Sequence, residues 1–149
     1  MLGSLFPFDL RTTVQKWIAS FLAFLFLLFP FLQTGATLTL DAPATTESEQ
    51  ISFTMHNKTS QDLSYGIGSY TLERQTMLGW REVPVRDDFV YIKILYVCPA
   101  GGKSKVVLDV IPRFGKLLDA GDYRVTVHCG TQNSTVPTMV QTVFTVSAA

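Results

Sequence analysis

The chain has little of what metal and redox sites are built from, because its 149 residues include only two cysteines and two histidines. Twelve basic and twelve acidic residues cancel, so the sequence offers no basic excess for the phosphates of a nucleic acid. The motifs Gly-x-Ser-x-Gly, His-Glu-x-x-His and the phosphate loop are absent from the sequence. We therefore expect a non-enzymatic protein with no cofactor, no bound metal and no nucleic-acid partner.

What the sequence does contain is a long hydrophobic run near its N-terminus. Residues 17–32 are sixteen residues without a charge, preceded by Arg11 and Lys16. Small residues at Thr34 and Ala36 suit a cut after Ala36, so the layout predicts a secretory signal peptide over residues 1–36 and an exported protein. The alternative is an uncleaved anchor, since residues 17–40 give 24 uncharged residues, enough to cross a bilayer. The membrane is expected to be contacted only through this segment.

The remaining residues, 37–149, are enough for one domain with a single core. Residues 41–50 read as a loose lead-in, and 113–118 could make one helical turn. Polar and apolar residues alternate with period two in eight places, which predicts an all-β antiparallel sandwich of seven or eight strands. The expected strands cover residues 37–41, 51–56, 70–73, 80–85, 91–98, 106–110, 123–129 and 140–146.

Three stretches resemble the bacterial immunoglobulin-like domains of secreted and cell-surface proteins. They are a strand and polar turn over residues 53–65, a strand with Gly79, Trp80 and Pro84 over 70–84, and Phe114-Gly115 leading to Ala120–Val125. Together they cover about residues 50–129. The resemblance implies an immunoglobulin-like sandwich and an extracytoplasmic location, but no shared catalytic residues.

Two aromatic residues have expected structural roles. Tyr123 follows Gly121 at the start of a strand, where a tyrosine-corner hydroxyl bonds back to the preceding loop. Trp80 is predicted to cap one end of the core, with an exposed binding anchor as the alternative.

The resemblance also suggests a disulfide. If the strands follow immunoglobulin order, residues 91–98 form strand D and residues 123–129 strand F, in opposite sheets and ending at the same pole. Cys98 and Cys129 both fall on inward rows, and an exported location favours oxidation. A Cys98–Cys129 bridge closing 31 residues is therefore predicted, with two free buried thiols as the alternative.

The other polar candidates are expected to have no ligand. His56 and His128 fall on outward rows, and turn chemistry accounts for the acidic pairs at 87–88 and 119–122. The glycosylation patterns beginning at Asn57 and Asn133 are expected to be unused in a bacterium.

We accordingly predict an exported binding module at the cell surface or envelope, with a protein or an envelope polymer as partner. Recognition is expected at the loops of one pole, namely 57–62, 99–102 and 130–137. Outward apolar residues at Val107, Ile111 and Val143 suggest a partner surface and a homodimer. The alternative function is a small secreted hydrolase or metal-binding protein.

Overall fold

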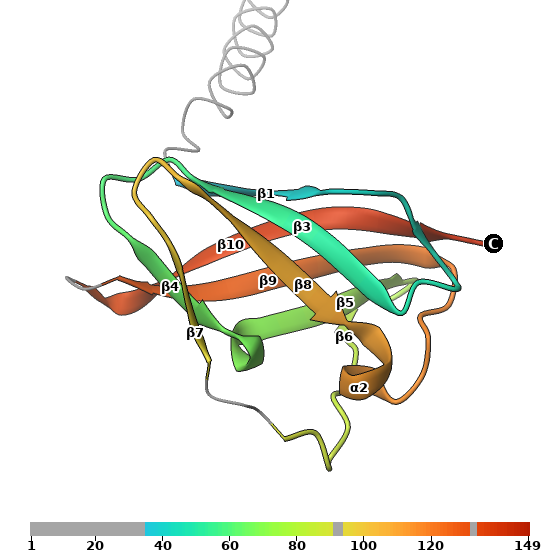
Figure 1. Cartoon of the computed structure of the whole chain (residues 1–149). Coiled ribbons are helices and arrows are strands. Elements are labelled where there is room, and N and C mark those ends of the chain that lie inside the picture. Colours follow the sequence, from blue (N-terminus) through green and yellow to red (C-terminus); the bar gives the residue numbers. More distant parts are fainter. Residues whose placement is uncertain (1–34, 91–93, 132–133) are drawn as a thin grey trace, which may run out of the picture. The chain divides into compact units, whose positions relative to one another are not determined.

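The computed structural model describes residues 35–90, 94–131 and 134–149, and these form two β-sheets packed face to face (Figure 1). The smaller sheet is antiparallel, and both of its outer strands pair with the central one. Its order is β1 (Ala36–Leu40), β3 (Gln50–Asn57) and β8 (Lys103–Asp109).

The larger sheet is built around the long hairpin of the last two strands. One edge carries a two-residue strand that runs parallel to the final strand, and the other pairings are antiparallel. The order is β2 (Ala44–Thr45), β10 (Ser134–Ser147), β9 (Gly121–Thr131), β4 (Leu63–Gly66) and β7 (Leu95–Cys98), with β5 (Tyr70–Thr76) also on β9 and β6 (Gly79–Glu82) on β5.

Two short strands occupy the place beside β9 in succession. Both β4 and β5 pair with β9, and the 3-10 helix η2 (Ile67–Ser69) interrupts them. A Cβ atom on Gly66 would lie 3.3 Å from the Ile94 carbonyl oxygen, so the backbone passes closely there. The interruption lets β5 leave the plane of β4 and continue beyond the sheet.

The core lies between the two sheets, where the inward rows of the alternating strands meet. Phe53 of the smaller sheet and Phe144 of the larger one make an edge-to-face contact with ring centroids 5.3 Å apart. The predicted alternation is confirmed in these rows. The largest fully buried side chains are Tyr65, Tyr123, Phe53, Met55, Leu63, Leu72, Leu108, Val106, Val110, Val125, Val127 and Val140.

The one helix of the described residues that is not a 3-10 turn is α2 (Val110–Phe114), so the expected turn at 113–118 begins three residues earlier. It ends at Gly115, whose φ of 77° is the left-handed conformation that favours glycine. Arg113 is buried and donates hydrogen bonds to the carbonyl oxygens of Ile67 and Tyr70. The guanidinium therefore holds α2 against η2 and the start of β5.

Two predictions about single segments are wrong. The lead-in 41–50 contains β2, where Ala44 is buried and pairs with Val146, because the residues after β1 cross to the edge of the larger sheet. The strand expected over 91–98 is β7, residues 95–98, and it pairs with β4 in the larger sheet. Residues 91–93 lie outside the described residues.

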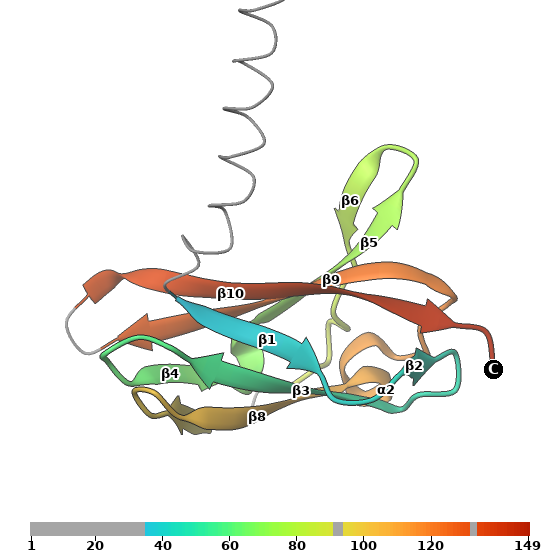
Figure 2. The same cartoon turned by 90° about the horizontal axis from the view of Figure 1, so that it is seen from above.

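We call the two ends of the sandwich the proximal pole and the distal pole. The proximal pole is the end where β1 begins, with Ala36 paired to Asn57 and the 99–102 turn beside it. The distal pole is the opposite end, marked by Asp109 and Gly121. The strand β5 pairs with β9 as far as Arg74 and Tyr123, and Figure 2 shows the rest of the β5–β6 hairpin projecting from the body over the distal half of β9.

The signal segment itself lies outside the described residues, but its boundary can be compared with β1. Ala36, the predicted cleavage position, is the first residue of β1, and Leu38 is buried in the core. Residues 36–40 belong to the smaller sheet, so the anchored alternative is limited to the residues before 36, and the choice between cleavage and anchoring stays a prediction. Within the described ranges, no helix is long and apolar enough to cross a membrane.

Candidate interaction surface

The most exposed apolar side chains of the described residues lie at the tip of the β5–β6 hairpin, which we call the arm (residues 70–82). Met77 is 103% exposed and Leu78 is 82% exposed. They stand in a tight turn that Gly79 closes with a φ of 97°. Thr76 supports the turn, since its hydroxyl donates to the Gly79 carbonyl oxygen at 2.7 Å.

The arm is fixed to the sheet on its outer face. Arg124 of β9 donates two hydrogen bonds, each 2.7 Å, to the carboxylate of Glu73. The Trp80 ring lies over the same guanidinium, 4.8 Å from ring centroid to Cζ. The Arg124 hydrogen bonds hold the pKa of Glu73 below its ordinary value, so this bidentate pair is ionised at neutral pH.

Trp80 therefore does not have its expected role. It is half-buried on the outer face and does not belong to the core between the sheets, so the prediction of a core-capping tryptophan is wrong. The reason is the register of the arm, which pairs Trp80 with Gln75 and points both side chains away from the smaller sheet.

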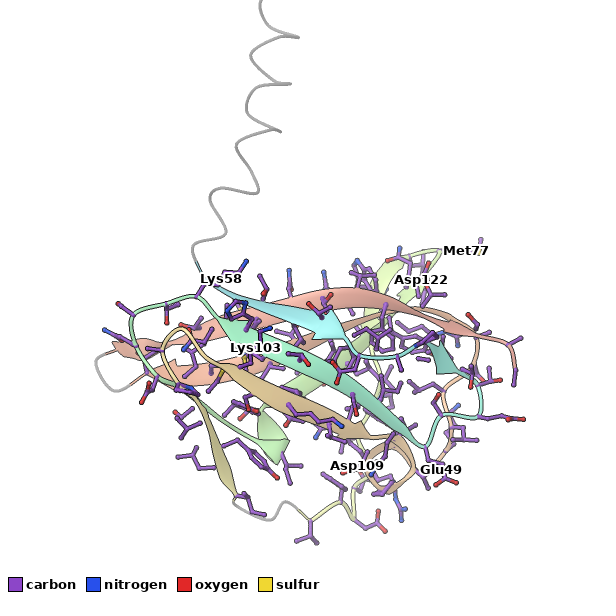
Figure 3. The ribbon with its side chains drawn as sticks, turned by 45° about the horizontal axis from the view of Figure 1, so that its top comes forward. Glu49, Lys58, Met77, Lys103, Asp109 and Asp122 are labelled. Atoms are coloured by element: carbon purple, nitrogen blue, oxygen red, sulfur yellow. The ribbon has the colours of Figure 1, made fainter. Side chains whose placement is uncertain are left out.

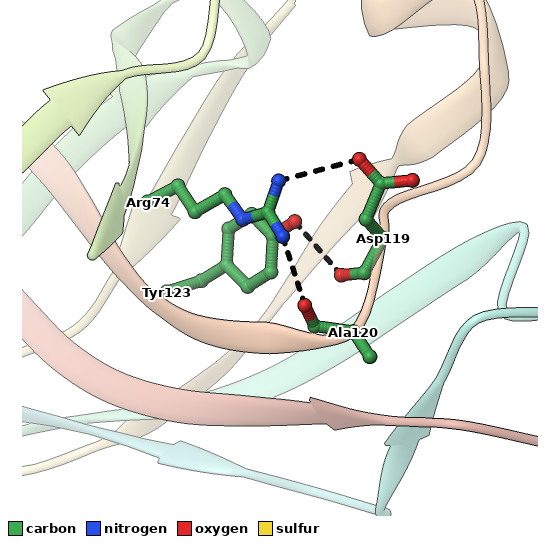
Figure 4. Close-up of polar contacts among 4 residues, drawn as sticks. All are labelled: Arg74, Asp119, Ala120 and Tyr123. Atoms are coloured by element: carbon green, nitrogen blue, oxygen red, sulfur yellow. Dashed lines mark hydrogen bonds and ion pairs between the residues drawn. The ribbon is translucent and has the colours of Figure 1, made fainter. Parts of the chain in front are cut away.

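The inner face of the arm is fixed by a second arginine (Figure 4). Arg74 donates to Asp119 Oδ2 at 3.3 Å and to the Ala120 carbonyl oxygen at 2.9 Å, and its guanidinium lies 5.8 Å from the Tyr123 ring centroid. Gly121 leaves room for this contact, since a Cβ there would be 3.4 Å from Arg74 Nε.

The tyrosine corner is confirmed. Tyr123 donates its hydroxyl hydrogen to the Asp119 carbonyl oxygen at 2.9 Å, four residues upstream. Burial raises the pKa of Tyr123, with Arg74 opposing and Asp119 adding to that shift, so the hydroxyl remains a donor. The loop 119–121 is thus held from both sides.

A groove of about 280 Å³ lies at the foot of the arm. Its apolar wall comes from the segment after β6 and from α2 with its following loop, and Arg81 and Lys116 stand on its rim without an ion pair to any described residue. Arg74 and Arg81 are direct cross-strand partners, so cations gather on this face of the arm. The groove is lined by Arg74, Thr76, Arg81, Glu82, Val83, Pro84, Phe114, Lys116, Leu118, Asp119 and Tyr123.

The predicted pole loops lie at the proximal pole and are tied down there. Asn57 is fully buried, and its amide donates to the carbonyl oxygens of Gln61 at 2.7 Å, Cys98 at 3.1 Å and Pro99 at 3.1 Å. Its Oδ1 accepts from the Thr59 backbone N–H and hydroxyl. The folded domain therefore leaves no amide hydrogen of Asn57 for a glycan.

The third segment, 130–137, is mostly not a loop. The β9–β10 hairpin extends to Thr131 and resumes at Ser134, and Ser64 pairs with Gly130 beside the other two loops. Residues 132–133 lie outside the described residues. The three segments share a pole, as predicted, but 57–62 and 99–102 are hydrogen-bonded turns and the third segment is largely strand.

The predicted disulfide is wrong in this structure, where Cys98 and Cys129 are free and buried. Both lie in the larger sheet on either side of β4, and two strand spacings are about 9.5 Å, beyond the roughly 7 Å that a bridged pair of Cα atoms allows. Met55 lies between them, with its carbonyl oxygen 3.8 Å from the Cys98 sulfur and its Sδ 4.0 Å from the Cys129 sulfur. Burial raises the pKa of both thiols, that of Cys129 to about 11.

The other polar candidates lie apart. His56 and His128 are half-buried on different sheets, Asp88 pairs with Arg86, and Asp119 belongs to the Arg74 contact. In the described part of the chain, no group of three histidine, cysteine, aspartate or glutamate side chains is placed to hold a metal ion.

The three residues that suggested a dimer surface do not share a face. Val107 points outward from the smaller sheet and Val143 outward from the larger sheet, while Ile111 lies in α2. They cannot form one patch, so the homodimer stays a prediction without these residues as its surface.

Sequence reasoning missed the exposed apolar tip of the arm. The available signal was the pair Met77-Leu78 between Thr76 and Gly79, because large apolar residues in a turn cannot both be buried there. What sequence alone could not give is the direction of the arm, which depends on the interruption at η2.

A model of the bacterial Ig-like domain family matches residues 32–141, so the chain belongs to that family. None of the curated proteins matches the chain. Among solved structures it is similar to BslA, described as a bacterial hydrophobin, with 14% identity, 77% of this chain and 94% of that chain covered, and a TM-score of 0.38. At this TM-score the likeness supports no argument about function.

Proposed function

We propose that this chain is an exported, non-enzymatic immunoglobulin-like module that acts at the cell surface or in the envelope. It binds a protein or an envelope polymer through the arm and the groove at its foot. The N-terminal apolar segment directs the export, and the membership of the bacterial Ig-like domain family agrees with such a place.

One observation carries the binding proposal. The arm is clamped by Arg124 on its outer face and by Arg74 on its inner face, yet its tip is apolar and fully exposed. Exposed apolar side chains cost solubility, and a rigid support lowers the entropy lost when they are covered. A clamped arm with an uncovered apolar tip is therefore the arrangement expected of a contact element.

Export is tested with the full chain carrying an epitope tag after Ala149. We expect antibody and added protease to reach the tag on intact cells, and N-terminal sequencing to separate a form cut near Ala36 from an uncut one. A tag that becomes accessible only after permeabilisation would refute the export.

Binding is tested by placing a photo-cross-linking amino acid at Met77, with Gln141, exposed on the outer face of β10, as the matched position. We expect a discrete envelope component to be captured from Met77 and not from Gln141. Equal capture at both positions, or none at Met77, would contradict the role of the arm.

A further inference from the structure

We propose that, in the uncleaved chain, the proximal pole docks onto anionic phospholipid headgroups at the outer surface of the membrane. The inference rests on the export proposed above, and it adds an orientation to the displayed module. It is carried by two independent observations, the distribution of charge on the domain and the point where the N-terminal segment joins it.

Charges of opposite sign stand at the two ends of the strands, although the distal half also carries Arg81 and Lys116. Lys58 and Lys103 lie at one end, and Glu49, Asp109 and Asp122 lie at the other (Figure 3). None of these five makes an ion pair with a described residue.

The register explains the basic end. Lys103 pairs with His56 and Lys105 with Thr54, so both lysines lie on the outward face of the smaller sheet, and Lys58 follows Asn57 directly. Two carboxylates lie beside these lysines. Asp62 accepts a hydrogen bond from the Ala100 N–H, and Asp41 accepts one from the hydroxyl of Thr54, the cross-strand partner of Lys105. Three exposed lysines thus stand against two nearby carboxylates, which favours an anionic partner.

The attachment point selects which anionic partner this is. The strand β1 starts at Ala36 opposite Asn57, so the chain joins the domain next to Lys58. Only residues 33–35 separate β1 from the last residue of the apolar run, Leu32. Three extended residues span at most about 11 Å, close to the Debye length of about 8 Å at physiological salt. In an anchored chain the three lysines therefore lie within electrostatic reach of the headgroups.

The size of the effect suits a tethered contact. A lysine near an anionic membrane surface favours the bound state about fivefold, so three lysines favour it about a hundredfold. This would be a weak interaction for a free protein, but the tether makes the encounter intramolecular. Glu49, Asp109 and Asp122 at the distal pole are repelled by the same surface, so the lysine end is the one that faces the membrane.

The test uses the full chain reconstituted in phosphatidylcholine vesicles with or without phosphatidylglycerol. Fluorophores are attached through Gln61→Cys at the proximal pole or Met77→Cys at the arm tip, and energy transfer to an acceptor lipid in the bilayer reports proximity. The native thiols at Cys98 and Cys129 are buried, so the introduced thiols are labelled selectively. The charge variant is Lys58→Gln/Lys103→Gln, and the matched control, Arg81→Gln/Lys116→Gln, removes the same charge from the distal half.

We expect phosphatidylglycerol to increase transfer from position 61 but not from position 77, and high salt to reverse the increase. The lysine variant should lower the ratio of docked to undocked domains about 25-fold, and the control variant should leave it unchanged. Equal transfer in neutral and anionic vesicles, equal effects of the two variants, or a preference for a soluble anionic wall polymer over the vesicles would overturn the proposal. Unreactive native thiols verify that each variant is folded. Failure here leaves export untouched, because accessibility of the tag on cells does not depend on headgroup charge.

Discussion

Replacing Asn57 is the sharpest test of how the proximal pole is held together. The change Asn57→Ala removes two acceptor contacts at Oδ1 and the donor contacts to three carbonyl oxygens, which share the two amide hydrogens. At about 1 kcal/mol per hydrogen bond, four effective bonds give a loss of roughly 3 to 4 kcal/mol. That is a large part of the roughly 5 to 15 kcal/mol that stabilises a domain.

The nearly isosteric change Asn57→Asp tests the direction of the same hydrogen bonds. A carboxylate would face three carbonyl oxygens without a donor, so at neutral pH this variant should be at least as unstable as the alanine variant. The surroundings raise the pKa of the introduced carboxyl above its ordinary value of about 3.9. The loss of unfolding free energy in the Asn57→Asp variant should therefore be smallest below about pH 4 and should grow until the pH has passed the raised pKa of the folded state.

Both variants are measured by urea unfolding of residues 35–149, followed by far-ultraviolet circular dichroism. Gln61→Ala is the control, because this side chain is exposed in the same loop and makes no side-chain hydrogen bond in the described structure. It should change the unfolding free energy by less than about 0.5 kcal/mol. A loss below about 1 kcal/mol for Asn57→Ala, or a neutral-pH Asn57→Asp variant as stable as the parent, would refute the reasoning.

Three further outcomes are expected. Tyr123→Phe should cost about 1 kcal/mol in urea unfolding by removing the bond to Asp119, whereas Tyr96→Phe should cost less; equal costs would contradict the tyrosine corner. Glu73→Gln should lower the unfolding free energy by about 1 to 2 kcal/mol at neutral pH. Because the pKa of Glu73 is lowered in the folded state, this loss should vanish as the pH falls through that lowered pKa. A loss that does not depend on pH would refute the role of the Glu73 carboxylate. Thiol titration without reductant should find no reactive cysteine in the native domain and two after unfolding, and none after unfolding would restore the bridge.

The strands that the sequence predicted well are those with one buried face. In β3, β8 and β9 every second residue is apolar and inward, so period two is visible without any knowledge of the partner strand. The tyrosine corner was also predictable, because Gly121 and Tyr123 belong to one local turn.

The failures involve partners that are distant in the sequence. Alternation over 91–98 suggested a half-buried strand, but Leu95 is 69% exposed and β7 is an edge of the larger sheet. The prediction placed residues 91–98 in the sheet opposite residues 123–129, and the wrong Cys98–Cys129 disulfide followed from that placement. The strand β2 is two residues long and is formed only because β10 lies beside it, so no local pattern could reveal it.

The parallel pairing of β2 with β10 has a mechanical consequence. Ala44 and Val146 lie side by side near the distal pole, while the chain joins the domain at the other pole. A force applied between an anchored N-terminal side and a load attached after Ala149 would slide these two strands past each other. The hydrogen bonds between the strands would then be loaded in shear, all at the same time. The Thr46 N–H bond to the Ser147 carbonyl oxygen, 2.9 Å long, joins the same two segments and would carry part of this load.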